Sequence, residues 1–190
     1  MSYKIKTIFI CFVLTFLSLH CFAEENFLSN STYSLCFTPA KHCTNQITKA
    51  INQAQKQILL QSLSFTSYPI AKALKAAQKR GVVVKILLDR RELDDKFSML
   101  KYCRKYGMDV LIDYLPAIAH NKVIIIDDAV VVTGSFNFTK SADVRNAENV
   151  LIIKDAKIAR LYSENWQSRA IASVKVEDYY RRGLDKVVRE

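Results

Sequence analysis

Residues 120–137 read HNKVIIIDDAVVVTGSFN, two short apolar runs separated by an acidic pair. The runs, 123–126 and 130–133, are typical of buried strands, and the acidic pair between them is typical of a tight turn. Polar side chains stand at the outer ends of both runs, in the pattern H-x-K-x4-D-x6-G-S-x-N. The stretch therefore predicts a β-hairpin that carries reactive groups at its edge.

Apolar runs and helical spacing extend outward from this hairpin. Mostly apolar runs predict strands at residues 33–37, 57–64, 82–88, 108–113 and 149–153. Helical spacing of apolar residues predicts helices near 47–54, 69–80, 97–106 and 158–166, the second with Ser67 as its cap. The charged stretch 89–96 and the polar stretch up to Asn146 are predicted to be loops. These elements predict a single-domain α/β fold, an α/β/α sandwich around a mixed, mostly parallel sheet.

The composition fits a globular domain with a polyanionic partner. The chain has 190 residues, half of them hydrophobic, which is enough for one domain with a sizeable core. Twenty-eight basic residues against 18 acidic ones give a net charge of +10. Such an excess favours nucleic acid or an anionic membrane as the partner, although a solvated basic surface would also produce it.

The N-terminal residues resemble an export signal. Lys4 and Lys6 precede an apolar run from Ile8 to Phe22, and Cys21-Phe22-Ala23 offers small residues for cleavage. We expect residues 1–23 to be a signal peptide and 24–190 the folded domain, in an exported protein that is periplasmic, secreted or envelope-associated. A retained segment would instead give a membrane anchor. Cleavage would remove two lysines and leave a net charge of +8.

The cysteines suggest one local bridge. Cys11 and Cys21 lie in the expected signal, which leaves Cys36, Cys43 and Cys103. Export permits disulfides, and Cys36 and Cys43 flank one short loop, so their pairing is the simplest. The alternative is three small buried thiols.

The polar residues of the hairpin suit phosphodiester cleavage, which needs a nucleophile, an acid for the leaving oxygen, and donors for the phosphoryl oxygens. His120 can act as nucleophile or acid. Lys122 lies two residues on, so both side chains point to one face of a strand. Asn137 and Ser135 offer an amide and a hydroxyl for the same oxygens. Glu148 is suited to hold the other ring nitrogen of His120, and no metal or other cofactor is expected.

Taken singly, each of these residues has an ordinary structural explanation. Together, the residues of the motif and Glu148 resemble the signature of the phospholipase D superfamily. Further similarity, to its small exported bacterial endonucleases, lies in the segments 64–67, 80–84 and 88–89. The resemblance implies cleavage through a phosphohistidine at His120. It also places Asp127 among the candidate catalytic residues, although Asp127 resembles a structural member of the motif more than the catalytic acid.

The resemblance also implies a homodimer. The family reaction uses two histidines, whereas this chain carries one copy of the motif, so a second subunit must supply the other. Basic residues near the loops favour a nucleic-acid substrate, DNA before RNA. These are Arg90, Arg91, Lys140 and Arg145, the last two expected to bind substrate. Phe136 and Phe138 are predicted either to stack on bases or to pack in the core. The alternatives are a phospholipase D that acts on membrane phospholipids and a non-catalytic, envelope-associated nucleic-acid-binding protein.

Overall fold

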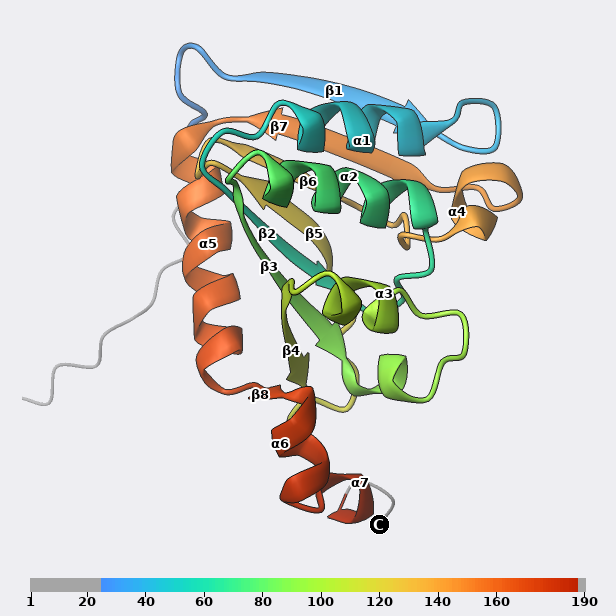
Figure 1. Ribbon diagram of the computed structural model, residues 1–190. Coiled ribbons are helices and arrows are strands. Elements are labelled where there is room, and N and C mark those ends of the chain that lie inside the picture. The colour runs from blue at the N-terminus through green and yellow to red at the C-terminus, as the bar shows by residue number, and fades with distance from the viewer. Residues whose placement is uncertain (1–24, 188–190) are drawn as a thin grey trace, which may run out of the picture.

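A computed structural model describes residues 25–187, so the expected signal at 1–23 lies outside the described residues. Figure 1 shows one sheet flanked by helices. In the first half the elements are β1 (Thr32–Phe37), α1 (Cys43–Asn52), β2 (Gln57–Ser62), α2 (Tyr68–Lys79), β3 (Val83–Asp89), the short 3-10 helix η1 (Arg90–Leu93), α3 (Leu100–Lys105) and β4 (Asp109–Asp113). In the second half they are β5 (Lys122–Ile126), β6 (Val130–Gly134), α4 (Lys140–Val144), β7 (Asn149–Lys154), α5 (Ala156–Ile171), β8 (Val174–Lys175), α6 (Val176–Arg181) and α7 (Leu184–Val187).

The eight strands form one mixed sheet in the order β1-β7-β6-β5-β2-β3-β4-β8. The parallel pairs are β2–β3 and β3–β4, and every other neighbouring pair is antiparallel. The mixed α/β sheet is confirmed, but the expectation that it would be mostly parallel is wrong. The β-α-β units of the first half are parallel as their sequence predicts, whereas the hairpin and the edge strand β1 add antiparallel pairs.

Helices cover both faces of the sheet, as expected for an α/β/α sandwich. Ile58 and Leu60 of β2 point into the main core beneath α1, α2 and α3, whereas Leu59 points into a second core beneath α5. Trp166 of α5 closes this second core, and its indole Nε1 donates a hydrogen bond of 3.0 Å to the main-chain oxygen of Leu60. Burial of both faces therefore explains why the central strands are mostly apolar.

Several short elements differ from the prediction. The charged stretch after β3 is not only loop, because the Asp89 carboxylate accepts the main-chain N–H of Arg91 and begins η1. The polar stretch before Asn146 includes α4, which Thr139 caps by accepting the N–H of Ala142. Ser67 does stand at the cap position of α2, but its side chain makes no capping hydrogen bond. Local side-chain capping determines such short elements, and apolar periodicity does not detect them.

The strand directions bring the polar ends of several strands to the same end of the sheet, where the strands stop. β2, β3 and β4 end there, and β5 begins there, because Ser62 pairs with Lys122 in the antiparallel register. β6 ends and β7 begins at the same end of the sheet, where Gly134 pairs with Val150. The connection from β4 to β5 must cross the ends of β3 and β2 to reach its place. None of the helices in residues 25–187 is long and apolar enough to span a bilayer.

Candidate active site

His120 lies in the connection between β4 and β5, and its side chain is exposed to solvent. It borders a pocket of about 270 Å³ together with residues from β5, β6 and α5. The other lining residues are Asn121, Lys122, Val123, Thr133, Gly134, Ser135 and Tyr162. The structure therefore brings His120, Lys122 and Ser135 of the predicted site together, and adds the partly buried Tyr162 of α5, which was not predicted as a site residue.

Lys122 is a buried cation beside the expected nucleophile. Its side chain is only 7% exposed, and its Nζ donates a hydrogen bond of 2.6 Å to the main-chain oxygen of His120. Burial lowers the pKa of the Lys122 ammonium below its ordinary value, and the negative charge of Glu148 partly opposes this. An ammonium carries three protons, so two remain for the oxygens of a bound phosphodiester.

Glu148 holds a different group from the one predicted. Its Oε2 accepts a hydrogen bond from the Ser135 hydroxyl, and its Oε1 accepts one of 2.9 Å from the Asn146 side-chain amide. Within one chain the carboxylate therefore orients Ser135 and Asn146, not the ring of His120. The Ser135 oxygen also accepts the N–H of Asn149 at 3.1 Å, so this hydroxyl is committed to protein partners and not free for a phosphate.

The corner between β6 and Ser135 requires glycine. Gly134 has φ +144°, a conformation that side chains rarely adopt. A Cβ built on it would lie 2.2 Å from the main-chain oxygen of Asn149. The close approach of β6 and β7 at this point is what brings Ser135 within reach of Glu148.

Asn137 is half-buried just beyond this corner, and its amide oxygen is buried without a hydrogen-bond donor among the described residues. Buried amide oxygens without a partner are rare in folded proteins. This oxygen is an acceptor enclosed by protein atoms, and Asn137 is not among the residues that line the pocket of His120.

Asp127 lies at the opposite end of the hairpin. Seven residues of extended chain, at about 3.3 Å each, place it roughly 20 Å from His120. Its carboxylate accepts the main-chain N–H groups of Gln55, Lys56 and Gln57 at 2.7–2.9 Å. Asp127 and Asp128 have φ of 55° and 50°, which suits a tight hairpin turn. Asp127 thus fastens the hairpin to the start of β2 and is too distant to act on a substrate at His120.

A larger pocket of about 490 Å³ lies at this far end, between α1 and the sheet. Asp127 is the one predicted site residue among those that line it. We place the active site at the smaller pocket, because His120 and Lys122 are there.

The two phenylalanines of the motif region belong to the core. Phe136 and Phe138 are almost fully buried, and the ring of Phe138 packs edge-on against Phe65 with centroids 6.4 Å apart. The prediction that at least one packs in the core is confirmed, and neither is placed to stack on a base. Lys140 and Arg145 are exposed at the two ends of α4.

The sulfur chemistry is as predicted from the cysteine spacing. Cys36 and Cys43 form a disulfide with Cα atoms 5.7 Å apart, while Cys103 is free and buried. Burial raises the pKa of the Cys103 thiol to about 12, so this thiol is inert near neutral pH. Within residues 25–187, no group of three or more histidine, cysteine or carboxylate side chains is arranged to hold a metal ion.

The disulfide loop holds the main chain of Glu148 through hydrogen bonds with Thr38, which was not predicted from the sequence. The hydroxyl of Thr38 accepts the N–H of Glu148 at 3.1 Å and donates to the main-chain oxygen of Asn146 at 2.9 Å. The Thr38 N–H in turn donates to the Glu148 main-chain oxygen at 3.0 Å. These residues are about 110 positions apart in the chain, so only the pairing of β1 with β7 brings them together.

Comparison with known proteins identifies a consistent set of relatives. A family model described as cardiolipin synthase, PLD-like domain, matches residues 47–169. A protein named phospholipase D from Rickettsia prowazekii (strain Madrid E) is 52% identical over 146 residues, which are 77% of this chain and 71% of that protein.

Two solved structures show the same fold. Nuc from Salmonella typhimurium, a phospholipase D family member, superposes with a TM-score of 0.72 and 37% identity, covering 75% of this chain and 96% of its own. NucT from Helicobacter pylori superposes with a TM-score of 0.72 and 27% identity, covering 76% of this chain and 98% of its own. Both neighbours are therefore matched over nearly their whole length.

Proposed function

We propose that this chain, which belongs to the family of phospholipase D-like domains, cleaves nucleic-acid backbones as an endonuclease whose active site a second copy completes. Hydrolysis of a phosphodiester bond is the chemistry of the family. The observation that carries the proposal is the exposed imidazole of His120 beside the buried ammonium of Lys122, in a pocket whose lining includes no second histidine from residues 25–187. Such a site has a nucleophile and a cation for the phosphate, but it lacks a separate acid for the leaving oxygen.

In the proposed reaction, a ring nitrogen of His120 attacks phosphorus. The bond from phosphorus to the leaving oxygen breaks, while protonated His120 of the partner subunit gives that oxygen its proton. The partner's His120, now neutral, then removes a proton from water, and the hydroxide oxygen attacks phosphorus. The phosphorus–nitrogen bond breaks, which restores both imidazoles. Lys122 neutralises charge on the phosphoryl oxygens, and the side-chain N–H groups of Asn137 would donate hydrogen bonds to them.

The surface for the second copy is the uncovered face of β1. Ser34 and Cys36 face α1, so alternation places Tyr33, Leu35 and Phe37 on the opposite face. On that face α5 packs against β2, β4, β5 and β6, and it does not extend over β1. Tyr33 and Phe37 are therefore 72% and 55% exposed. An exposed apolar row on a sheet face marks an interaction surface.

This apolar row is continuous with the active site. Leu35 pairs with Leu151 across β1 and β7, and Leu151 pairs with Thr133 across β7 and β6. Thr133 lines the pocket of His120. A second copy seated on this face by two-fold symmetry would therefore approach the pocket, and each chain could bring its own His120 to the shared site.

Charge supports a nucleic-acid substrate. The chain carries a net charge of +10, and cations attract the phosphate backbone without regard to sequence. Exposed Arg91, Lys140 and Arg145 stand free of any ion pair among the described residues. Arg90 does not belong to this group, because its guanidinium is used within the fold.

One observation favours a phospholipase as the second candidate. The sequence showed no apolar entry patch for a lipid, but Leu115 and Ile118, in the connection that carries His120, are 59% and 42% exposed. Exposed apolar side chains beside a nucleophile would suit a lipid interface. The Rickettsia relative also bears the name phospholipase D.

A paired assay separates the candidates. Purified protein would be given plasmid DNA and RNA in one set of reactions and phosphatidylcholine vesicles in another, with His120→Ala as the control in both. We expect nicked or shortened nucleic acid and no released choline from the wild-type protein. Choline release without nucleic-acid cleavage would replace the proposal by the phospholipase. Retarded but uncleaved DNA would indicate a non-catalytic binding protein.

A further inference from the structure

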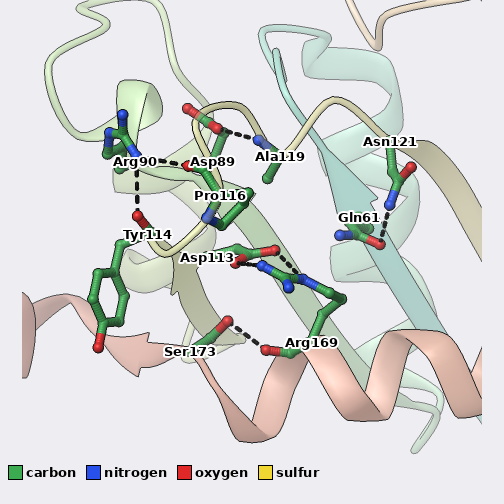
Figure 2. A network of polar contacts seen from close by, with 10 residues as sticks. All are labelled: Gln61, Asp89, Arg90, Asp113, Tyr114, Pro116, Ala119, Asn121, Arg169 and Ser173. Carbon is green, nitrogen blue, oxygen red and sulfur yellow. Dashed lines mark hydrogen bonds and ion pairs between the residues drawn. The ribbon is translucent and has the colours of Figure 1, made fainter.

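The connection between β4 and β5, residues 114–121, carries the nucleophile without any regular secondary structure of its own. Such a segment has few main-chain hydrogen bonds to hold it, and it would be mobile unless other groups fasten it. His120 lies near its end, so the position of the imidazole depends on whatever fixes this segment. Two consecutive residues, the last of β3 and the first of η1, provide most of the hydrogen bonds that hold it (Figure 2).

Arg90 forms hydrogen bonds to the first half of the segment. Its guanidinium donates three hydrogen bonds to main-chain oxygens: those of Tyr114 at 3.0 Å, Pro116 at 2.8 Å and Ala117 at 3.2 Å. Figure 2 shows the side chain of Arg90, the first residue of η1, close to Tyr114 and Pro116 of this connection. A guanidinium has five donors in a rigid plane, so it can hold several carbonyl groups in one fixed arrangement.

Asp89 forms a hydrogen bond to the second half of the segment. Its carboxylate is fully buried, and Oδ2 accepts the main-chain N–H of Ala119, the residue before His120, at 2.6 Å. Its Oδ1 accepts the N–H of Arg91 at 2.9 Å, which fixes the carboxylate itself. Hydrogen bonds to an ionised acceptor are about twice as strong as neutral ones, and burial strengthens them further.

The residue after His120 is held by the neighbouring strand. The side-chain amide of Asn121 donates to the side-chain oxygen of Gln61 at 3.1 Å, and the Asn121 main-chain oxygen accepts the N–H of Leu63 at 3.2 Å. His120 thus stands between two anchored residues, Ala119 and Asn121, while its own side chain stays exposed. The backbone at the nucleophile is fixed although the imidazole is free to meet a substrate.

We infer that Asp89 and Arg90 are positioning residues for His120, which set the attack geometry through the main chain of residues 114–119 without touching the substrate. The inference rests on the proposed role of His120. A misplacement of a catalytic group by about 1 Å costs on the order of 100-fold in rate. Residues that lock a catalytic segment therefore act on kcat more than on substrate binding.

A purely structural ion pair in the same region provides a contrast. Arg169 donates to both carboxylate oxygens of buried Asp113, at 3.0 Å and 2.5 Å, and so ties the end of β4 to α5. That pair joins two regular elements and makes no bond to residues 114–121. Asp89 and Arg90, in contrast, bond to the irregular segment itself.

The test compares matched arginine variants on a small phosphodiester, bis(p-nitrophenyl) phosphate. Arg90→Gln removes the guanidinium that donates hydrogen bonds to three main-chain oxygens. Arg182→Gln removes the same charge from an exposed position at the end of α6, outside the candidate site. Arg80→Gln removes a guanidinium that bonds to the main-chain oxygens of Ile51 and Ala54, far from the site. We expect Arg90→Gln to lower kcat by roughly 10- to 100-fold with KM within about threefold, and both controls to keep kcat near wild type.

A second readout does not depend on activity. The described residues contain only two histidines, His42 and His120, so the imidazole proton resonances of His120 can be followed by NMR. In Arg90→Gln and Asp89→Asn we expect the His120 resonances to shift or broaden while those of His42 stay in place. Arg90→Lys should restore part of kcat, because an ammonium can still donate to one carbonyl.

Unchanged kcat and unchanged His120 resonances in folded Arg90→Gln would overturn the inference. If Asp89→Asn fails to fold, Arg90→Gln decides alone, since that side chain is only partly buried. If the wild-type protein does not cleave phosphodiesters, the proposed function fails, and the NMR comparison still shows whether Asp89 and Arg90 hold His120.

Discussion

The ammonium of Lys122 donates a hydrogen bond of 2.6 Å to the main-chain oxygen of His120, so the cation and the nucleophile of the site are joined directly. The lysine is buried at the start of a strand, while the histidine next to it is exposed. A buried charge with a lowered pKa is costly to the fold, and such groups cluster at functional sites. We attribute the retention of this cation to phosphate binding.

Lys122→Met should therefore lose activity without losing stability. Methionine has a similar length but no charge, so it removes the phosphate contact and also the cost of the buried ammonium. We expect cleavage to fall at least 100-fold and the free energy of unfolding at pH 7 to stay within about 1 kcal/mol of wild type, or to rise.

The pH dependence of the unfolding free energy tests whether the buried ammonium of Lys122 destabilises the fold. Because burial lowers the pKa of Lys122, its cost is present at pH values below that lowered pKa and disappears as the pH rises past the ordinary value of 10.5. The stability advantage of Lys122→Met should thus be largest near neutral pH and vanish above about 10.5. Urea unfolding at several pH values checks this. A variant that is several kcal/mol less stable at pH 7 would show that Lys122 is structural.

The Cys36–Cys43 disulfide should support activity as well as stability. The bridge closes a short loop, for which chain entropy predicts about 2–3 kcal/mol. Thr38 lies within that loop and holds the main chain of Glu148. We expect Cys36→Ala/Cys43→Ala to lower both the free energy of unfolding and kcat.

Thr38→Val separates the two effects. It keeps the bridge and removes only the hydroxyl that contacts Glu148 and Asn146. We expect a several-fold loss of kcat with a smaller loss of stability. The control is Cys103→Ala, which keeps the Cys36–Cys43 disulfide and removes only the free thiol. A reductant that breaks the disulfide should lower the activity of this variant as it does that of the wild type. If Thr38→Val and the double cysteine variant both keep wild-type kcat, the loop does not support the site.

Hydrolysis should survive chelation of metal ions. Lys122 supplies the positive charge, one imidazole acts as the nucleophile and the other transfers the protons, so the proposed steps need no Lewis acid. Cleavage of plasmid DNA in excess EDTA should stay near its untreated rate. Abolition by EDTA, with recovery on addition of magnesium, would contradict the mechanism.

The sequence predicted most of the elements, because apolar runs and helical spacing record the two-faced burial of this sheet. It did not predict that β1 would join β7 at the edge, since strand order depends on contacts between distant segments. The true role of Asp127 was hidden for the same reason, because the N–H groups that it accepts lie about 70 residues earlier in the chain.

Within the site, residue spacing placed His120, Lys122 and Ser135 together, because the hairpin register is local. The partners of Glu148 were not predictable, because Ser135 and Asn146 reach it through the corner at Gly134 and the loop after α4. Arg90 was expected to attract nucleic acid, and no positioning role was predicted for it or for Asp89, since their bonds to residues 114–119 depend on the connection that crosses β3.

The central claim is that two copies of the chain share one site, each contributing its His120. The most direct measurement mixes wild-type chains with His120→Ala chains under conditions of subunit exchange and follows cleavage against the wild-type fraction. If two histidines are needed, each mixed dimer is nearly inactive, and activity falls as the square of the wild-type fraction. A strictly linear fall, or full activity in a species that sediments as a monomer, would contradict the account.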